Sequence, residues 1–239
     1  MSELVSNAEA QADDAAALEG EGAAEEGRLS TAIEIAVLLT VLSLLPAVLI
    51  SITSFTRIVI VLSFVRRALS VNELPPNPVI IGLALFLTTF VMAPVGERIY
   101  EQAYQPYKAG QLESGAAAEV AWTEMRSFLV ANTRESELAL FAEMSKFEGE
   151  VDEAGELPFS VVVPAFVLSE LKTAFQMGFL LFLPFLVIDL VVSSILLSMG
   201  MFMLPPVMIS TPFKILVFVL VDGWHLVCHS VVSSFIPVG

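Results

Sequence analysis

Long apolar blocks that are nearly free of charge constrain this sequence more than any other feature. Four such blocks cover residues 29–65, 79–95, 179–204 and 212–235. A helix that crosses a membrane needs about 20 consecutive apolar residues. Only 15% of the 239 residues are charged, against roughly a quarter in soluble domains. The chain is therefore expected to be embedded in a membrane or docked on one.

The apolar blocks are predicted to be helices. Isolated strands cannot satisfy their backbone groups in lipid, and the β-branched run at 58–61 is too irregular for a barrel. The expected fold class is all-α, with hydrophobic helical hairpins and a small helical insertion.

Composition divides the first half of the chain into two parts. Residues 1–28 form an acidic, low-complexity tail whose composition predicts disorder. Residues 29–95 form a first hydrophobic hairpin, with one helix over about 31–51, a break, and a second helix. The hairpin's last apolar block is expected to end at Pro94, because proline lacks an N–H group and fixes φ.

The second half changes character twice. Residues 96–157 are acidic and resemble a soluble domain, and their apolar residues recur at helical spacing. Residues 158–239 form a second hydrophobic hairpin. It is expected to contain an amphipathic helix over 160–178, a span that ends at Pro205, and a last span from about Pro212 to Phe235.

The positive charges predict an orientation. Lys and Arg accumulate in cytoplasmic loops, which places Arg66 and Arg67 in the cytoplasm. Lys214 supports placing the turn at 205–212 on the same side. Both termini and the region 96–157 are then expected on the outer, periplasmic side.

Several charges lie in or against the apolar runs: Arg57, Glu170, Lys172, Asp189, Lys214 and Asp222. A charge at bilayer depth costs from about 3 to more than 10 kcal/mol, so it is normally paired or faces water. These charges predict a conducting path or an ion-pair network between subunits. For Arg57 and Lys214 the alternative is snorkelling to the interface. Arg134, from the soluble region, is predicted to pair with Glu170.

Met199, Met201 and Met203 directly precede a pair of prolines. In a continuous helix Met199 and Met203 share a face, whereas a bend at Gly200 would let all three line one ring. Methionine is flexible and polarizable, so such a ring from several copies would form a deformable seal. Ordinary packing at the end of a span is the alternative.

Other classes of function find little support. The net charge of −15 argues against nucleic acid as a partner. Cys228 is the only cysteine, and His225 and His229 have the spacing of a metal pair without a clear third ligand. No phosphate loop and no nucleophile-base-acid set is present, so neither an enzyme nor a cofactor is expected.

A series of motifs occurs in order over about residues 40–237 and resembles the FliP family of flagellar biosynthetic proteins. Its members are TSFTRIVIVL at 53–62, PPN at 75–77, GLALFLT at 82–88, MAP at 92–94, TRE at 133–135, SELKTAF at 169–175, FLPFLVID at 182–189, MGM at 199–201, PFK at 212–214 and VDGW at 221–224. Ser70 departs from the pattern, because glycine is expected there, and Phe202 interrupts the methionines.

The resemblance implies a core subunit of the type III protein export gate in the bacterial inner membrane, at the flagellar basal body. Several copies would assemble with FliQ and FliR into a helical oligomeric pore complex that works with FlhB and passes unfolded flagellar proteins. Met199, Met201 and Met203 would form the methionine gasket that closes the pore. In that family the apolar faces are buried largely between subunits. An apolar helix face can be covered by a partner helix as well as by lipid, so a high hydropathy does not distinguish the two.

Two alternatives remain open from the sequence. One is the equivalent subunit of a virulence injectisome. The other, from a different class, is a small polytopic ion or solute transporter, which the charges within the apolar runs support. Four segments without an internal repeat would make a small transporter.

Overall fold

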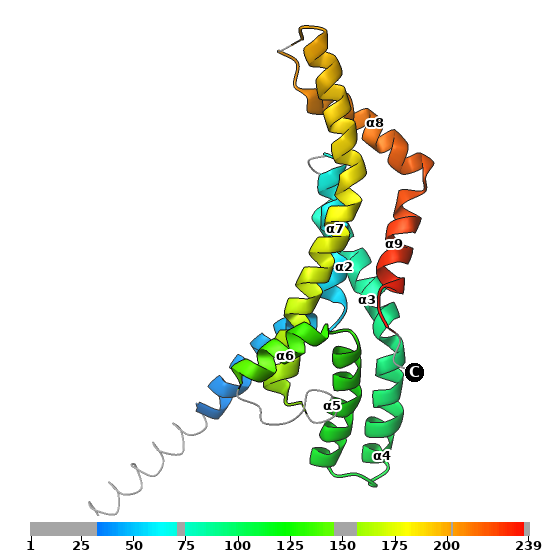
Figure 1. The fold of residues 1–239 in the computed structure, drawn as a ribbon. Helices are drawn as coiled ribbons and strands as arrows, with labels where there is room; N and C mark the ends of the chain where they lie inside the picture. The colour runs from blue at the N-terminus through cyan, green and yellow to red at the C-terminus, as the bar shows by residue number, and fades with distance from the viewer. Residues whose placement is uncertain (1–32, 71–74, 146–156, 202, 237–239) are drawn as a thin grey trace, which may run out of the picture. The chain divides into compact units, whose positions relative to one another are not determined.

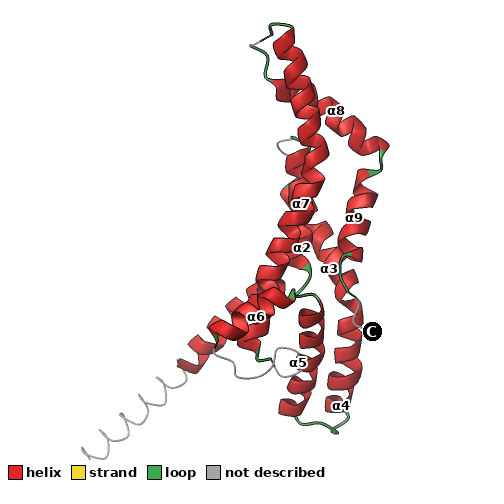
Figure 2. Ribbon diagram, viewed as in Figure 1, coloured by secondary structure: helices red, strands yellow, loops and turns green. Residues whose placement is uncertain are grey.

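The computed structural model describes residues 33–70, 75–145, 157–201 and 203–236 (Figure 1). These residues are helical apart from short turns, and no strand occurs among them (Figure 2). The all-α prediction is therefore confirmed. The predicted disordered tail at 1–28 lies outside the described residues.

The chain separates into two compact units, with the boundary after Leu49. The first unit contains most of the helix Ile33–Ser51, drawn in blue in Figure 1. This 19-residue helix is strongly apolar, and none of the residues in its apolar window is buried. Such a helix needs lipid or other protein around it. Its end at Ser51 agrees with the predicted break before a second helix.

The second unit is built around two helices, α2 (Phe55–Ala68) and α7 (Phe159–Ser198). Ile58, Val61, Leu62 and Val65 follow the i, i+3, i+4, i+7 pattern on α2 and are fully or almost fully buried. They pack against the first half of α7, where Phe166 is also fully buried. This contact is the centre of the hydrophobic core.

Helix α3 (Asn77–Ile99) continues into a π-helical turn, η1 (Tyr100–Tyr104), and then into α4 (Gln105–Lys108). The prediction that the helix ends at Pro94 is wrong, because Pro94 lies inside α3. A proline removes one backbone hydrogen bond, and neighbouring helices in a membrane protein tolerate that loss. The wider turn at η1 follows Pro94 by two helical turns.

Two amphipathic helices follow, α5 (Ser114–Ala131) and α6 (Glu135–Met144). Their inward faces carry Phe128 and Leu129 on α5 and Leu138 and Ala142 on α6. Helix α5 packs against α3, η1 and α7, and α6 packs against α7. The helical spacing of apolar residues in this acidic region therefore predicted its secondary structure.

Helix α7 is a single element of 40 residues that runs through Pro164 and Pro184. The prediction of two separate elements, over 160–178 and from residue 179, is wrong. At a rise of 1.5 Å per residue α7 is roughly 60 Å long, about twice the hydrocarbon core of a bilayer. One helix therefore carries both the buried core face and a long exposed apolar extension.

Helix α7 ends in a Schellman motif. Gly200 has a φ of +74°, and the N–H groups of Gly200 and Met201 donate to the carbonyls of Leu197 and Leu196, at 3.0 Å each. Pro205 then sets the start of α8 (Pro206–Leu220). The prediction that the proline pair breaks the span is confirmed.

The last hydrophobic segment is bent. Helices α8 and α9 (Gly223–Ser233) meet at 65° around Asp222, which has a φ of +51°. The predicted last span from Pro212 is wrong at its start, because α8 begins six residues earlier and includes Pro212. Among the described residues three helices are long and apolar enough to cross a membrane, and the bent pair α8–α9 would make a fourth.

Candidate functional site: buried charge pairs and the methionine turn

Arg57 and Glu170 form a buried ion pair between α2 and α7. Their side chains are 4% and 0% exposed. Arg57 Nε donates to Glu170 Oε2 at 2.9 Å, and Nη2 donates to Oε1. Nη1 donates to the carbonyl and the hydroxyl of Ser234, and the ring of Phe235 lies 3.8 Å from the guanidinium carbon. Arg57 is thus fully paired within the chain, so the snorkelling alternative is wrong for this residue.

Arg134 does not reach Glu170, so the predicted pair between them is wrong. Its backbone N–H donates to Ser169 Oγ at 3.1 Å, and its guanidinium donates to Thr173 Oγ1 at 3.2 Å and Gln176 Oε1 at 2.5 Å. Both oxygens of Glu170 are taken by Arg57. Arg134 therefore joins the start of α6 to α7 through hydrogen bonds to uncharged acceptors.

Lys172 pairs with Glu137, a residue that sequence reasoning missed. Lys172 Nζ lies 2.6 Å from Glu137 Oε1, and the Glu137 side chain is only 2% exposed. The hydrogen bond from Lys172 holds the pKa of the Glu137 carboxyl below its ordinary range, against the opposing effect of burial. Nothing in the local sequence distinguishes Glu137 from the exposed acidic residues around it.

Lys214 and Asp189 pair across the α7–α8 hairpin. The Lys214 side chain is 1% exposed, and its Nζ donates to Asp189 Oδ2 at 2.6 Å and to Ser70 Oγ at 2.7 Å. Ser210 Oγ donates to Asp189 Oδ1 at 2.6 Å. A buried ammonium with two acceptors is not snorkelling, so that alternative is wrong for Lys214 as well.

The same network explains the departure at Ser70. This residue has a φ of +56°, in the left-handed region that favours glycine. Its N–H donates to the Arg67 carbonyl at 3.0 Å, as the residue that follows a helix C-cap does. The hydrogen bond from Lys214 adds an interaction that glycine could not make. Serine at position 70 thus links the end of α2 to the α7–α8 hairpin.

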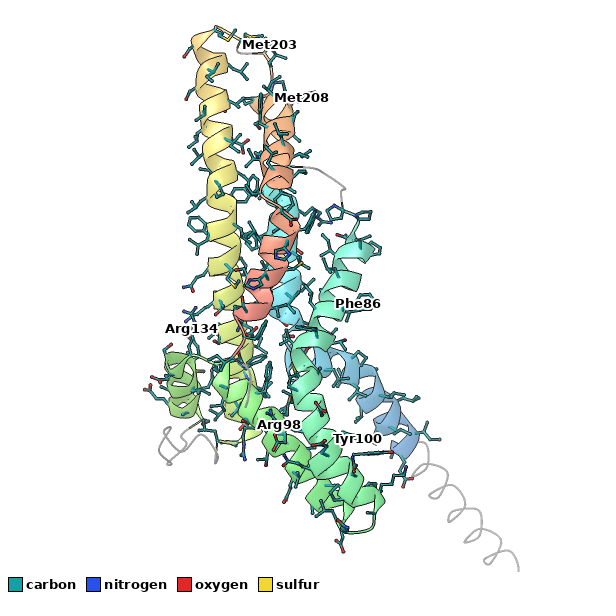
Figure 3. The ribbon with its side chains drawn as sticks, turned by 90° about the vertical axis from the view of Figure 1, so that its right-hand side faces the viewer. Phe86, Arg98, Tyr100, Arg134, Met203 and Met208 are labelled. Carbon is teal, nitrogen blue, oxygen red and sulfur yellow. The ribbon has the colours of Figure 1, made fainter. Side chains whose placement is uncertain are left out.

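The methionine turn, Met199 to Met203, lies at the end of the α7–α8 hairpin (Figure 3). Met199 is 67% exposed and Met203 95% exposed, and Met201 is also exposed. Phe202 lies outside the described residues. Side chains with this exposure are not packed on their own chain. The Schellman motif at Gly200 sets the backbone from which they project.

Asp222 is exposed at the bend between α8 and α9 and is not buried within the chain. The two histidines on α9 stack with ring centroids 6.2 Å apart. Across the residues that the structure describes, no three His, Cys, Asp or Glu side chains are grouped as metal ligands.

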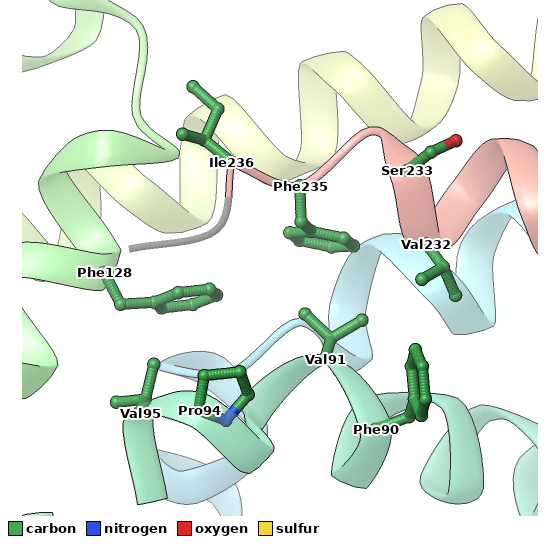
Figure 4. A pocket seen from close by; sticks show the side chains of 9 residues that line it. All are labelled: Phe90, Val91, Pro94, Val95, Phe128, Val232, Ser233, Phe235 and Ile236. Carbon is green, nitrogen blue, oxygen red and sulfur yellow. The ribbon is translucent and has the colours of Figure 1, made fainter. Parts of the chain in front are cut away.

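A cavity of about 400 Å³ lies between α3, α5 and the end of α9. Figure 4 shows its lining, with Phe128 and Phe235 facing Val91 and Pro94. Ser233 is the only polar residue in that lining. The ring of Phe235 also contacts the guanidinium of Arg57. The same side chain therefore lines the cavity and packs on the buried ion pair.

Long apolar helices, charges paired inside the helical unit and a large unpartnered apolar surface define a polytopic helical membrane protein. The FliP family model matches residues 38–231. The chain belongs to the FliP family.

Its relatives cover most of the chain. The flagellar biosynthetic protein FliP of Bacillus subtilis is 51% identical over 207 residues, which are 87% of this chain and 93% of that protein. FliP of Caulobacter vibrioides is 52% identical over 87% of this chain and 78% of its own length. FliP of Cereibacter sphaeroides is 51% identical over 85% and 67%.

Proposed function

We propose that this chain is a core pore-forming subunit of the flagellar type III export gate, which passes unfolded flagellar proteins across the inner membrane. As a member of the FliP family it is a component of that gate and not an enzyme. The names of the relatives favour the flagellar gate over the virulence injectisome. The observation that most directly supports a pore is the exposure of the methionine turn.

The exposed apolar surface supports assembly into an oligomer. The second half of α7 and most of α8 expose large apolar side chains, including Val187, Leu190, Ile195, Leu216 and Leu220. Patches of this extent mark protein or lipid contacts. Several copies of this chain, together with FliQ, FliR and FlhB, are the proposed partners that cover it. Where partners are absent, lipid can cover the same apolar surface.

The methionine turn is the proposed gasket. The Lys214–Asp189 pair joins α7 to α8 at the inner part of the hairpin, and the Schellman motif sets the geometry of its tip. The ion pair and the Schellman motif therefore hold the backbone of the turn in place. Met199, Met201 and Met203 project from it and are not covered by other described residues of the chain. Thioether side chains adapt to varied partners, which suits a seal that must yield to an unfolded chain.

The remaining charges and the topology belong to the same proposal. Asp222 is exposed and Arg134 is only half-buried, so both are available to neighbouring subunits. The proposed orientation has Arg66 and Arg67 on the cytoplasmic side. The termini and the region 96–157 then lie on the periplasmic side.

Two measurements test the proposal. In a strain that lacks the native gene, this chain should restore secretion of flagellar subunits into the medium. The triple substitution Met199→Ala, Met201→Ala and Met203→Ala should raise ion leak across the cell membrane while the gate still assembles. Met144→Ala, at an exposed methionine on α6, is the matched control. Unchanged leak in a normally assembled triple variant would contradict the gasket.

A further inference from the structure

Helix α9 carries two histidines that the proposed export function does not use. His225 and His229 are the only histidines in the sequence, and both are exposed. Their i, i+4 spacing places them on one side of the helix, one turn apart. The two rings are nearly parallel, at 14°, and their centroids are 6.2 Å apart. The fold therefore brings two imidazoles together at the surface of α9.

The two histidines belong to a polar row along α9. His225, His229 and Ser233 recur every four residues after Asp222, and all four side chains are exposed. Val227 and Val231, on the other side of the helix, are buried. Charged and polar side chains in membrane proteins face water or protein rather than acyl chains. The row therefore borders a polar space that can hold water and ions.

The ring nitrogens of both histidines are available to a ligand. Within the described part of the chain, neither imidazole forms a hydrogen bond or an ion pair. An open hollow of about 570 Å³ between α3 and α9 is lined by both rings. The remaining residues that line it are Leu83, Leu87, Phe90, Trp224, Cys228 and Val232. This space is large enough for an ion and the water molecules bound to it.

The separation of the rings suits a shared transition-metal ion. A tetrahedral ion with bonds of about 2.0–2.1 Å holds two imidazole nitrogens about 3.4 Å apart, with the ring centroids about 5 Å apart. The centroids are 6.2 Å apart in the structure, so the rings must approach by about 1 Å. Exposed side chains rotate freely enough for this change. Two histidines at i, i+4 on one helix also bind zinc in the H-E-x-x-H motif.

The donor set identifies the class of ion. Imidazole nitrogen suits zinc, copper and nickel, whereas calcium and magnesium prefer oxygen ligands. Cys228 precedes His229 directly but is half-buried. Among the described residues, it is not grouped with the two histidines as a third ligand. Water is left to complete the coordination of the ion.

We propose that His225 and His229 form a surface site for one divalent transition-metal ion, with zinc as the best match and water in the remaining positions. The bound ion links two successive turns of α9. The site lies on a different element from the methionine turn and does not depend on the proposed export function.

Competition with a chromophoric chelator for Zn²⁺ tests the site in the full chain, purified in detergent with an affinity tag that contains no histidine. The chain should bind one Zn²⁺. His225→Gln or His229→Gln should weaken binding by at least about tenfold, because even the loss of a group that only supports a ligand costs that much. Cys228→Ser should bind as the native chain does. A loss in Cys228→Ser as large as that in His229→Gln, or native binding in the double histidine variant, would overturn the proposal.

A second variant separates the spacing of the histidines from their number. His229→Gln with Ser230→His keeps two exposed histidines but places them five residues apart, on different sides of α9. It should bind Zn²⁺ as weakly as His229→Gln alone, and native affinity in this variant would overturn the proposal.

Electron paramagnetic resonance of bound Cu²⁺ identifies the ligands directly. The native chain should show coupling to two imidazole nitrogens, and His229→Gln should show one. A native spectrum without two nitrogen ligands would also overturn the proposal.

Discussion

Arg57 and Glu170, 113 residues apart in the sequence, form a buried ion pair that joins α2 to α7. The pair also holds the end of the chain, because Arg57 donates to Ser234 and stacks on Phe235. The Arg57 guanidinium on α2 therefore contacts both α7 and the segment that follows α9. Removing either partner leaves an uncompensated charge in the core.

Glu170→Ala should destabilise the helical unit by about 3–5 kcal/mol, because it leaves the buried charge of Arg57 without its carboxylate partner. Unfolding in detergent, followed by the fluorescence of Trp122 and Trp224, measures the change. The double variant Arg57→Met with Glu170→Leu should recover most of the loss, since apolar pairs of similar volume replace buried ion pairs well. Glu143→Ala, at an exposed position, should stay within about 0.5 kcal/mol. A Glu170→Ala variant as stable as this control would contradict the role of the pair.

The Asp189–Lys214 pair should respond unequally to the loss of its two partners. Asp189→Ala leaves Lys214, 1% exposed, with Ser70 alone, whereas Lys214→Met leaves a carboxylate that is 31% exposed and still bonded to Ser210. We expect a loss of about 3–5 kcal/mol for the first change and about 1–3 kcal/mol for the second. The same unfolding assay gives both values, and the reverse order would show that the pair is not buried as described.

Gly178 and Gly82 form a matched pair for a packing test. A Cβ at Gly178 on α7 would lie 2.5 Å from the ring of Phe64, whereas a Cβ at Gly82 on α3 meets nothing within 4 Å. Gly178→Ala should therefore cost about 1–3 kcal/mol through overpacking. Gly82→Ala should be neutral or stabilise by up to about 1 kcal/mol, because alanine favours helix. Phe64→Ala combined with Gly178→Ala should relieve the overpacking. Equal effects at the two glycines would refute the close contact of α2 and α7.

The Glu137–Lys172 pair predicts a dependence on pH. The folded-state pKa of Glu137 is lowered, so the pair contributes full stability above the unfolded-state value, near 4.3. That contribution is lost as the pH falls through the lower folded-state pKa. Thermal unfolding between pH 6 and pH 3 should show the loss, and Glu137→Gln should reduce it. Glu135→Gln, at an exposed residue two positions before Glu137, should leave the pH profile unchanged.

Periodic patterns in the sequence predicted the elements whose apolar residues face one side. The stripe on α2 and the inward faces of α5 and α6 follow from spacing alone. Proline misled the prediction at Pro94 and Pro212, because both lie inside helices. Lost backbone hydrogen bonds are tolerated where neighbouring helices support the chain, and that support is not visible in local sequence.

The partners of the charges were harder to predict than their positions. Arg57, Asp189 and Lys214 stood out as charges within apolar runs, but the pairing Arg57–Glu170 depends on how α2 crosses α7. Glu137 lies in an acidic stretch, where nothing local separates it from its exposed neighbours. Ser70 appeared only as a departure from glycine, and its bond to Lys214 connects residues 144 positions apart.

The most direct test of a shared pore is a particle image of this chain co-expressed with FliQ and FliR and purified without crosslinking. We predict several copies around one central channel, with the methionine turns of all copies at its narrowest point. A particle with a single copy, or several copies whose methionine turns face outward, would contradict the proposed pore.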